Sequence, residues 1–301
     1  MPLKKIKPKT ELKTSVKAKL TWLPKKTFEL EFVIPWEKVK QAHNEVLLNE
    51  ASKISLKGFR KGKAPLELVE KSFDKEKLYQ KVLSRILAPA YEDAIKQHQL
   101  RPIISPKIQP LSLVEAKDWQ FKAVACETPT VKLGNYQEAI KAELAKGTIW
   151  VPGKGKPDKK EPKPSYDEKL KTATRALKET VEVEIADILT EDELNRMLTR
   201  LLDQVNSLGM TIDQYLSSKN ITQEQLRNNL RKQAEQTLKL EFVLQAIVLE
   251  QKIKISKGEV DKMIQATPDK KIQQKLDTEF QRSYIASLLA KRKALDYLTS
   301  L

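Results

Sequence analysis

Residues 57–65 have the sequence Lys-Gly-Phe-Arg-Lys-Gly-Lys-Ala-Pro, in which two glycines bracket one aromatic ring and two cations. Gly58 and Gly62 tolerate backbone angles that other residues avoid, so this stretch can form a tight, exposed loop. Pro65 fixes its φ angle near the helical value and therefore suits the first turn of a following helix. The pattern predicts a loop that leads directly into a helix, and the rest of the chain is arranged around it.

The predicted loop is strongly basic. Between Lys53 and Lys63 the chain carries five cations and no acid. A concentrated positive field on a loop favours docking to an anionic surface, and Phe59 at its tip could fill an apolar pocket or stack on a base. The alternative is a solvated basic loop in which Phe59 packs into its own core, since runs of charge are usually solvated. Composition alone leaves both interpretations open.

Two runs ahead of the loop alternate between apolar and polar residues and are separated by a short break at residues 24–26. This period of two predicts a β-hairpin with one buried face. The apolar positions are Val16, Ala18, Leu20 and Trp22 in the first run, and Phe28, Leu30, Phe32 and Ile34 in the second.

Helical spacing follows the hairpin. Pro35 ends the second strand and opens a helix to about Lys53, and a short helix is expected over 65–73 after the basic loop. Asp74 is placed to cap a longer helix to about residue 99, with a kink at Pro89. Prolines then punctuate residues 102–110, which favours an edge strand or irregular extended chain. A final alternating strand spans about 119–127, so the order is β-β-α-loop-α-α-β-β, an α+β domain.

The stretch from Gly58 to Pro65 resembles the ribosome-docking signature of trigger factor, the bacterial chaperone at the nascent-chain exit. The match is contiguous, and the resemblance extends over the flanking strands and helices. It implies that residues 1–133 form a ribosome-binding domain. By this resemblance the ribosome contacts are Phe59, Arg60 and Lys61, and the flanking signature consists of Gly58, Gly62, Lys63 and Pro65.

The composition changes sharply after a short helix at 137–146. Four prolines fall among glycines and lysines over 147–165, which is typical of an extended, semi-rigid linker. The short helix and this linker are expected to occupy residues 134–166. Residues 167–301 are expected to form a separate all-α domain.

Capping boxes mark several helices of this second domain. Starts are expected at Thr190/Glu193, Thr211/Gln214, Thr222/Gln225 and Ser256/Glu259, and Gly209 should end the helix that begins at Thr190. A last helix is expected from Pro268 to about Leu298, and its apolar residues are Ile272, Leu276, Phe280, Ile285, Leu288 and Leu289. Met197, Met210 and Met263 suit adaptable contacts with a client, although core filling is the favoured interpretation for each. This half resembles the trigger factor C-terminal domain, a helical chaperone body with extended arms.

Trigger factors normally carry a peptidyl-prolyl isomerase domain between these two parts. Here the interval from Leu133 to about Asp187 is too short and too polar, because such a domain needs roughly a hundred residues to enclose its pocket. No phosphate-binding loop and no nucleophile–His–acid set stands out. Cys126 is interpreted as a buried or half-buried strand residue rather than a nucleophile. The sequence predicts neither an enzyme nor a cofactor or metal protein.

Composition bounds the partners of the chain. Of its 301 residues, 56 are basic and 40 acidic, and a net charge of +16 favours anionic partners such as ribosomes or nucleic acid. The basic N-terminus has no apolar segment behind it, which predicts no signal peptide, a cytoplasmic location and no membrane partner. A single cysteine excludes an intramolecular disulfide.

Two functions fit these features. The first is an ATP-independent chaperone that docks on the large ribosomal subunit, touching protein and rRNA near the tunnel exit, and holds unfolded nascent polypeptides. The resemblance also allows a weak homodimer away from the ribosome. The alternative is an rRNA-binding ribosome-assembly factor that uses the same basic loop; few aromatics and no stacking sheet weigh against it. A third hypothesis, a secreted periplasmic chaperone, is disfavoured because no signal peptide is predicted.

Overall fold

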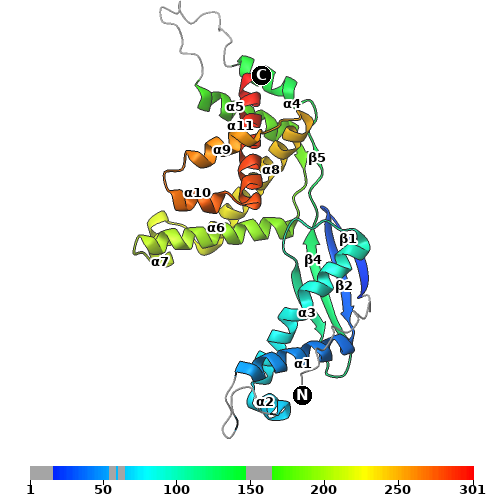
Figure 1. The fold of residues 1–301 in the computed structure, drawn as a ribbon. Coiled ribbons are helices and arrows are strands. Elements are labelled where there is room, and N and C mark those ends of the chain that lie inside the picture. Colours follow the sequence, from blue (N-terminus) through cyan, green and yellow to red (C-terminus); the bar gives the residue numbers. More distant parts are fainter. Residues whose placement is uncertain (1–15, 54–58, 60–64, 147–164) are drawn as a thin grey trace, which may run out of the picture. The chain divides into compact units, whose positions relative to one another are not determined.

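A computed structural model describes residues 16–53, 59, 65–146 and 165–301 (Figure 1). The chain divides into two compact units, residues 1–128 and 129–301. The basic loop apart from Phe59, and the Pro/Lys linker with it, lie outside the described residues. Each unit has its own core and is described by itself.

The first unit is built on a four-stranded antiparallel sheet with the order β1-β2-β4-β3. The predicted hairpin is confirmed, with Leu20 opposite Leu30. The predicted edge strand is also confirmed: Pro110 lies in the outermost strand, at a register irregularity, where its missing N–H is tolerated. The strands are β1 (Lys17–Leu23), β2 (Thr27–Ile34), β3 (Lys107–Ser112) and β4 (Trp119–Cys126).

Within the part of this unit that the structure describes, three helices lie between β2 and β3: α1 (Trp36–Lys53), α2 (Leu66–Ser72) and α3 (Lys75–His98). Asp74 caps α3 as predicted, since its Oδ1 accepts from the Glu76 N–H at 3.0 Å. The helix continues through Pro89 to a left-handed Gln99. The predicted order of strands and helices in this domain is therefore confirmed.

The core of the first unit lies between the inward face of the sheet and the helices α1 and α3. Phe32 and Phe121 stack with ring centroids 5.5 Å apart, and both are almost fully buried. Each large apolar side chain buried in this way contributes about 1.5–3 kcal/mol. Cys126 is buried at the end of β4, which confirms its structural interpretation. The helices contribute Val39, Val46, Leu78 and Val82 to the same core.

The second unit is mostly helical (Figure 1). Its core joins α4, α5, the later half of α8 and the later half of α11, and includes Ile140, Leu177, Ile247 and Leu298. The helices are α4 (Tyr136–Lys146), α5 (Tyr166–Thr180), α6 (Asp187–Ser207), α7 (Ile212–Lys219), α8 (Gln223–Glu250), α9 (Lys257–Gln265), α10 (Lys270–Leu276) and α11 (Glu279–Ser300). A short ribbon pairs β5 (Val131–Lys132) with β6 (Glu182–Val183).

Most of the predicted helix ends are confirmed. The boxes at Thr211, Thr222 and Ser256 have both of their hydrogen bonds, and Gly209 follows α6 with φ of +70°, which favours glycine. A further box, Ser165 with Glu168, opens α5 and was not predicted. The helix α4 packs against α5 in the core of this unit, although the sequence placed it in the connecting segment.

Two helix predictions in this unit are wrong. α6 begins at Asp187, so Thr190 is not a cap: it is buried inside the helix, where its hydroxyl donates to the Ala186 carbonyl. The packing of Ile188 and Leu189 keeps this earlier turn helical. The last helix is also two helices rather than one, because Asp269 caps α10 and Thr278 caps α11 separately.

Candidate binding surfaces

The basic loop is bracketed by the end of α1 and the start of α2 (Figure 1). Of the predicted docking residues, Phe59 and Pro65 are described, and Gly58 and residues 60–63 lie outside the described residues. Phe59 is 39% exposed, so its ring is not sealed in a core. The Pro65 carbonyl accepts from the backbone N–H of Leu68 and Val69, so Pro65 starts α2 as expected.

The two helices beside the loop are held on α3 by side-chain contacts. Glu50 in the last turns of α1 lies 2.7 Å from the Lys81 ammonium and 3.2 Å from that of Lys53. Hydrogen bonds from Lys81 and then Lys53 hold the pKa of the Glu50 carboxyl below its usual value. Lys81 also lies over the ring of Phe73, 5.6 Å from its centroid, where α2 ends. Sequence reasoning missed Glu50 and Lys81, because only the fold brings them together.

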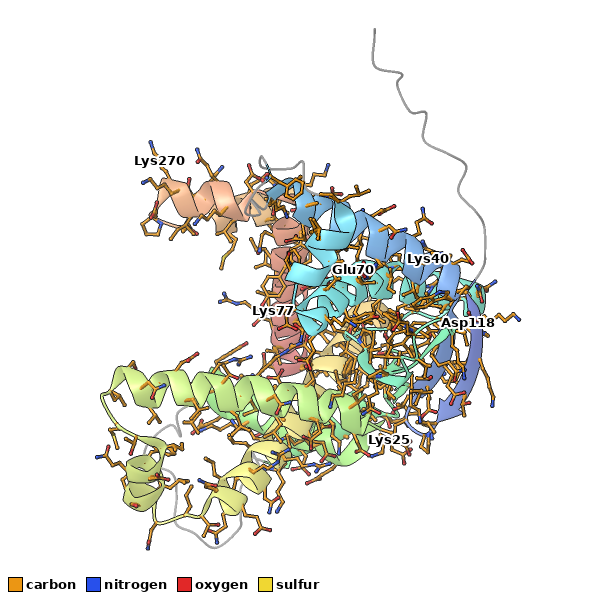
Figure 2. All side chains as sticks on the ribbon, turned by 90° about the horizontal axis from the view of Figure 1, so that it is seen from below. Lys25, Lys40, Glu70, Lys77, Asp118 and Lys270 are labelled. Atoms are coloured by element: carbon orange, nitrogen blue, oxygen red, sulfur yellow. The ribbon has the colours of Figure 1, made fainter. Side chains whose placement is uncertain are left out.

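Positive charge is concentrated in the unit that carries the loop. Residues 1–128 hold 26 basic and 15 acidic residues, a net charge of +11 out of +16 for the whole chain. Lys25, Lys40 and Lys77 are exposed on this unit, and Figure 2 labels them on the ribbon. Such a field attracts polyanions over a distance of about one Debye length, ~8–10 Å in physiological salt.

The second unit exposes a row of large apolar side chains on α11. Phe280, Tyr284 and Leu288 are spaced by four residues and therefore share one helix face, and they are 78, 55 and 45% exposed. The adjoining face of α11 buries Ile285 against Val260 and Ile264. We call Phe280, Tyr284 and Leu288 the α11 ridge. Exposed Ile272 and Met263 lie on the adjoining helices α10 and α9.

The exposure of these side chains was not specified by the sequence prediction. Phe280, Leu288 and Ile272 were predicted as apolar residues of the last helix, and the favoured core-filling use of Met263 is wrong, because that side chain is 52% exposed. The core beneath them is small, so α11 buries only one apolar face in this region. A signal was present in the sequence: residues 280, 284 and 288 form a second apolar row, separate from the row of 285 and 289. Two apolar rows on one helix are more than a small core can cover.

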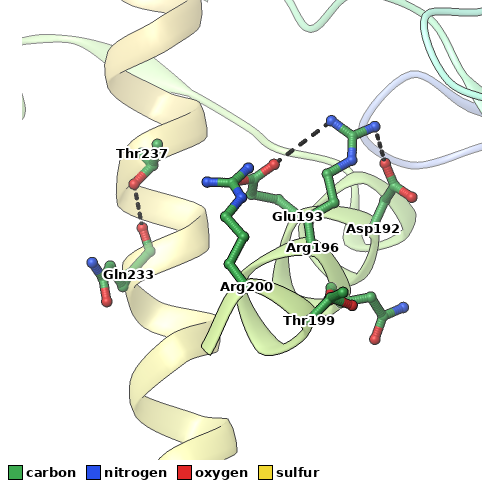
Figure 3. A network of polar contacts seen from close by, with 8 residues as sticks. Asp192, Glu193, Arg196, Thr199, Arg200, Gln233 and Thr237 are labelled. Atoms are coloured by element: carbon green, nitrogen blue, oxygen red, sulfur yellow. Dashed lines mark hydrogen bonds and ion pairs between the residues drawn. The ribbon is translucent and has the colours of Figure 1, made fainter. Parts of the chain in front are cut away.

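Another part of this unit is formed by α6, α7 and the first half of α8. Glu191 on α6 pairs with both Arg227 and Arg231 of α8, at 2.9 and 3.3 Å. Figure 3 shows the neighbouring network along α6, which contains the pairs Arg196–Asp192 and Arg200–Glu193. The two contacts of Glu191 join α6 to α8, whereas the pairs of Arg196 and Arg200 lie within α6.

Within the described ranges, no cluster of three or more His, Cys, Asp or Glu side chains could hold a metal ion. A hollow of about 220 Å³ lies among α5, β6 and α8, with apolar Leu177, Val183 and Leu240 in its lining and Lys178 and Lys239 beside them. Among the described helices, none has the length and apolar character that crossing a bilayer requires. The described surfaces therefore offer binding by charge and apolar contact.

The chain combines an α+β unit that carries a basic loop with a mostly helical unit that exposes apolar side chains, and two family profiles match this combination. The family profile described as "Bacterial trigger factor protein (TF)" matches residues 16–149. The profile described as "Bacterial trigger factor protein (TF) C-terminus" matches residues 159–300. Together the two profiles cover most of the chain, and the chain belongs to the trigger factor family.

Curated relatives align over part of the chain. The trigger factor of Lactiplantibacillus plantarum is 36% identical over 110 residues, which is 36% of this chain and 25% of that protein. The trigger factor of Staphylococcus epidermidis is 34% identical over 119 residues, 39% of this chain and 28% of that protein. The aligned part thus spans about a quarter of the length of these relatives.

A solved structure shares the fold over nearly the whole chain. It is described as "Promiscuous Substrate Recognition in Folding and Assembly Activities of the Trigger Factor Chaperone". The TM-score is 0.65 at 14% identity, and the alignment covers 94% of this chain and 99% of that one. The two profile matches leave residues 150–158 between them, too few for a further domain.

Proposed function

We propose that this protein is an ATP-independent, ribosome-associated chaperone of the cytoplasm that has no isomerase domain. The observation that carries the proposal is Phe59, 39% exposed within a stretch of five cations and no acid, on the unit that holds most of the net charge. The residues proposed to contact the ribosome are Phe59, Arg60 and Lys61, flanked by Gly58, Gly62, Lys63 and Pro65.

The proposed mechanism is physical rather than chemical. Charge steers the first unit to the anionic large subunit near the tunnel exit, and Phe59 adds one apolar contact. The α11 ridge then offers apolar surface to the emerging polypeptide. Each contact is weak, so the client is held by several at once and leaves when it buries its own apolar side chains.

The same ridge is the proposed contact of a weak homodimer away from the ribosome, which concentration-dependent sedimentation tests.

The test is co-sedimentation with 70S ribosomes at moderate salt. The variant Phe59→Ala/Arg60→Ala/Lys61→Ala removes one aromatic ring and two cations from the loop. A matched control, Trp22→Ala/Lys25→Ala/Lys26→Ala, removes the same groups from the exposed hairpin end of the same unit. We expect the wild type and the control to pellet with ribosomes and the loop variant to remain in the supernatant. If the wild type does not pellet, the proposal is overturned.

The charge of the first unit favours one alternative, an rRNA-binding assembly factor. Such a factor would bind free rRNA with an affinity that falls steeply with salt. Equal weakening of ribosome binding by the loop variant and the hairpin control would indicate diffuse charge and favour this alternative. Suppression of aggregation of an unrelated unfolded protein would favour the chaperone.

A further inference from the structure

Two segments on either side of the basic loop meet at a single side chain of α3. Lys81 Nζ lies 2.7 Å from Glu50 Oε2, near the end of α1, and 5.6 Å from the ring centroid of Phe73, the residue that ends α2. The other oxygen of the same carboxylate, Glu50 Oε1, pairs with Lys53, the last residue of α1. Lys81 therefore contacts both the helix that enters the loop and the helix that leaves it.

The partners of Lys81 are more enclosed than those of an ordinary surface ion pair. The Glu50 side chain is only 13% exposed, and Phe73 is half-buried. Exposed ion pairs contribute little, because solvent screens them and the side chains lose rotamer freedom. A shielded carboxylate with both oxygens occupied is held more firmly, and Lys81 adds a cation–π contact to it.

Among the described side chains near the loop, apolar packing is mixed. Ala51 of α1 and Val69 of α2 are buried there, whereas Leu48 and Leu68 are 57 and 44% exposed. The contacts of Lys81 with Glu50 and Phe73 add to this packing. The loop spans from Lys53 to Pro65, so the spacing of α1 and α2 sets the distance that the loop must bridge.

We propose that Lys81 is a positioning residue for ribosome docking, which holds the last turn of α1 through Glu50 and the orientation of α2 through Phe73, at the end of α2 away from the loop, and so sets the spacing of the two helices that the loop joins. The inference rests on the proposed function of the loop. Loss of the contact lowers the fraction of molecules with the correct spacing. A binding-competent fraction of one tenth weakens the apparent affinity about tenfold.

The chain offers a matched control for this inference. Arg85 of α3 pairs with Glu45 of α1 at 2.6 Å, so it joins the same two helices one helical turn further along α3. The side chains of Arg85 and Glu45 are both well exposed, at 51 and 43%. Lys81→Met and Arg85→Met each remove one cation and one α1–α3 ion pair. They differ in the contact with Phe73 and in distance along α1 from the loop.

The experiment measures the dissociation constant of the full chain for 70S ribosomes and the amide exchange of residues 48–53 and 66–72. We expect Lys81→Met to weaken binding about tenfold and to speed exchange in both segments, while Arg85→Met changes neither by more than about twofold. Equal losses in the two variants, or unchanged exchange in Lys81→Met, would overturn the inference. Thermal unfolding of each variant verifies that both still fold.

A charge swap separates positioning from direct contact with the ribosome. The double variant Glu50→Lys/Lys81→Glu keeps the net charge and the pair but moves the cation. The swap does not restore the contact with Phe73, so recovery is judged together with amide exchange. Recovery of ribosome affinity relative to Lys81→Met supports positioning, whereas exchange restored to the wild-type rate without recovery of affinity shows that Lys81 itself touches the ribosome and overturns the inference. If the wild type binds while Lys81→Met binds equally well, only this inference fails. If the wild type does not bind, the proposed function fails as well.

Discussion

The hydroxyl of Tyr136 donates a hydrogen bond to Glu250 Oε2 at 2.7 Å and accepts one from Gln251 Nε2 at 3.0 Å, which joins the start of α4 to the end of α8. The ring is 1% exposed, and burial raises the pKa of Tyr136 to about 12, so the hydroxyl keeps its proton at neutral pH. This contact closes the core of the helical unit across more than a hundred residues of sequence.

Tyr136→Phe should destabilise the helical unit by about 1–2 kcal/mol, because the ring stays buried while Glu250 and Gln251 lose a shared partner. Urea unfolding followed by circular dichroism measures this change. Tyr166→Phe is the control: its hydroxyl also donates to a carboxylate, Asp296, but its ring is 49% exposed. A loss in the control as large as in Tyr136→Phe would contradict the prediction.

The contacts of Glu259 predict that the stability of the fold decreases at acid pH. Its carboxylate pairs with Lys293 at 2.6 Å and accepts from the backbone N–H and the hydroxyl of Ser256, and these contacts lower its pKa to about 2. The folded pKa lies below the unfolded value of 4.5. The stabilisation is therefore complete above pH 4.5 and is lost as the pH falls toward 2.

Melting temperatures of the wild type and Glu259→Gln test this dependence. Glutamine still completes the capping box, so the difference reports the charge. We expect a lower melting temperature for the variant at pH 7 and a gap that closes between pH 4.5 and 2. Glu224→Gln, at an exposed position in the first turn of α8, should show no comparable closing. A gap that is constant with pH would rule out the assigned role of Glu259.

The turn of the β1–β2 hairpin should accept a stabilising substitution. Lys25 and Lys26 have φ angles of 59° and 55°, and the Thr27 N–H donates to the Pro24 carbonyl. Two successive left-handed residues suit glycine or asparagine better than lysine. Lys26→Gly should raise the free energy of unfolding by about 1 kcal/mol, since it relieves the contact of Cβ with its carbonyl.

Chemical denaturation of the first unit measures the Lys26→Gly effect. Lys17→Gly, within strand β1, provides the opposite expectation, a loss of about 0.5–1 kcal/mol from added backbone freedom. Equal losses in the two variants would show that Lys26 is not strained in solution.

Substitution of the α11 ridge should weaken client binding while leaving the stability of the fold nearly unchanged. Phe280→Ala/Tyr284→Ala/Leu288→Ala removes exposed apolar surface, so the free energy of unfolding should change by about 1 kcal/mol or less. Suppression of aggregation of a chemically unfolded client should fall clearly. Ile285→Ala, on the buried face, should instead cost about 2–5 kcal/mol. Undiminished suppression by the triple variant would remove the ridge from the client surface.

Local chemistry in the sequence predicted much of the fold. The alternation of Phe28, Leu30 and Phe32 specified a strand with one buried face, because side chains alternate along a strand whatever packs against it. Thr211, Thr222 and Ser256 marked helix starts, because a capping box closes within four residues. The basic stretch at residues 57–65 is likewise a property of consecutive residues.

Tertiary structure decided the features that depend on distant partners. Thr190 has the sequence of a cap, yet packing of Ile188 and Leu189 extends the helix before it. The α11 ridge is apolar enough for a core, and its exposure follows from the small size of the cluster on the other face. Lys81 reaches Glu50 and Phe73 only because α1, α2 and α3 pack together.

The sequence by itself determined the elements and the charge of the loop, since these depend on neighbours along the chain. Only the tertiary structure decided which apolar faces are covered and which side chains join α1 to α3 beside the loop, since both depend on contacts between residues far apart in sequence.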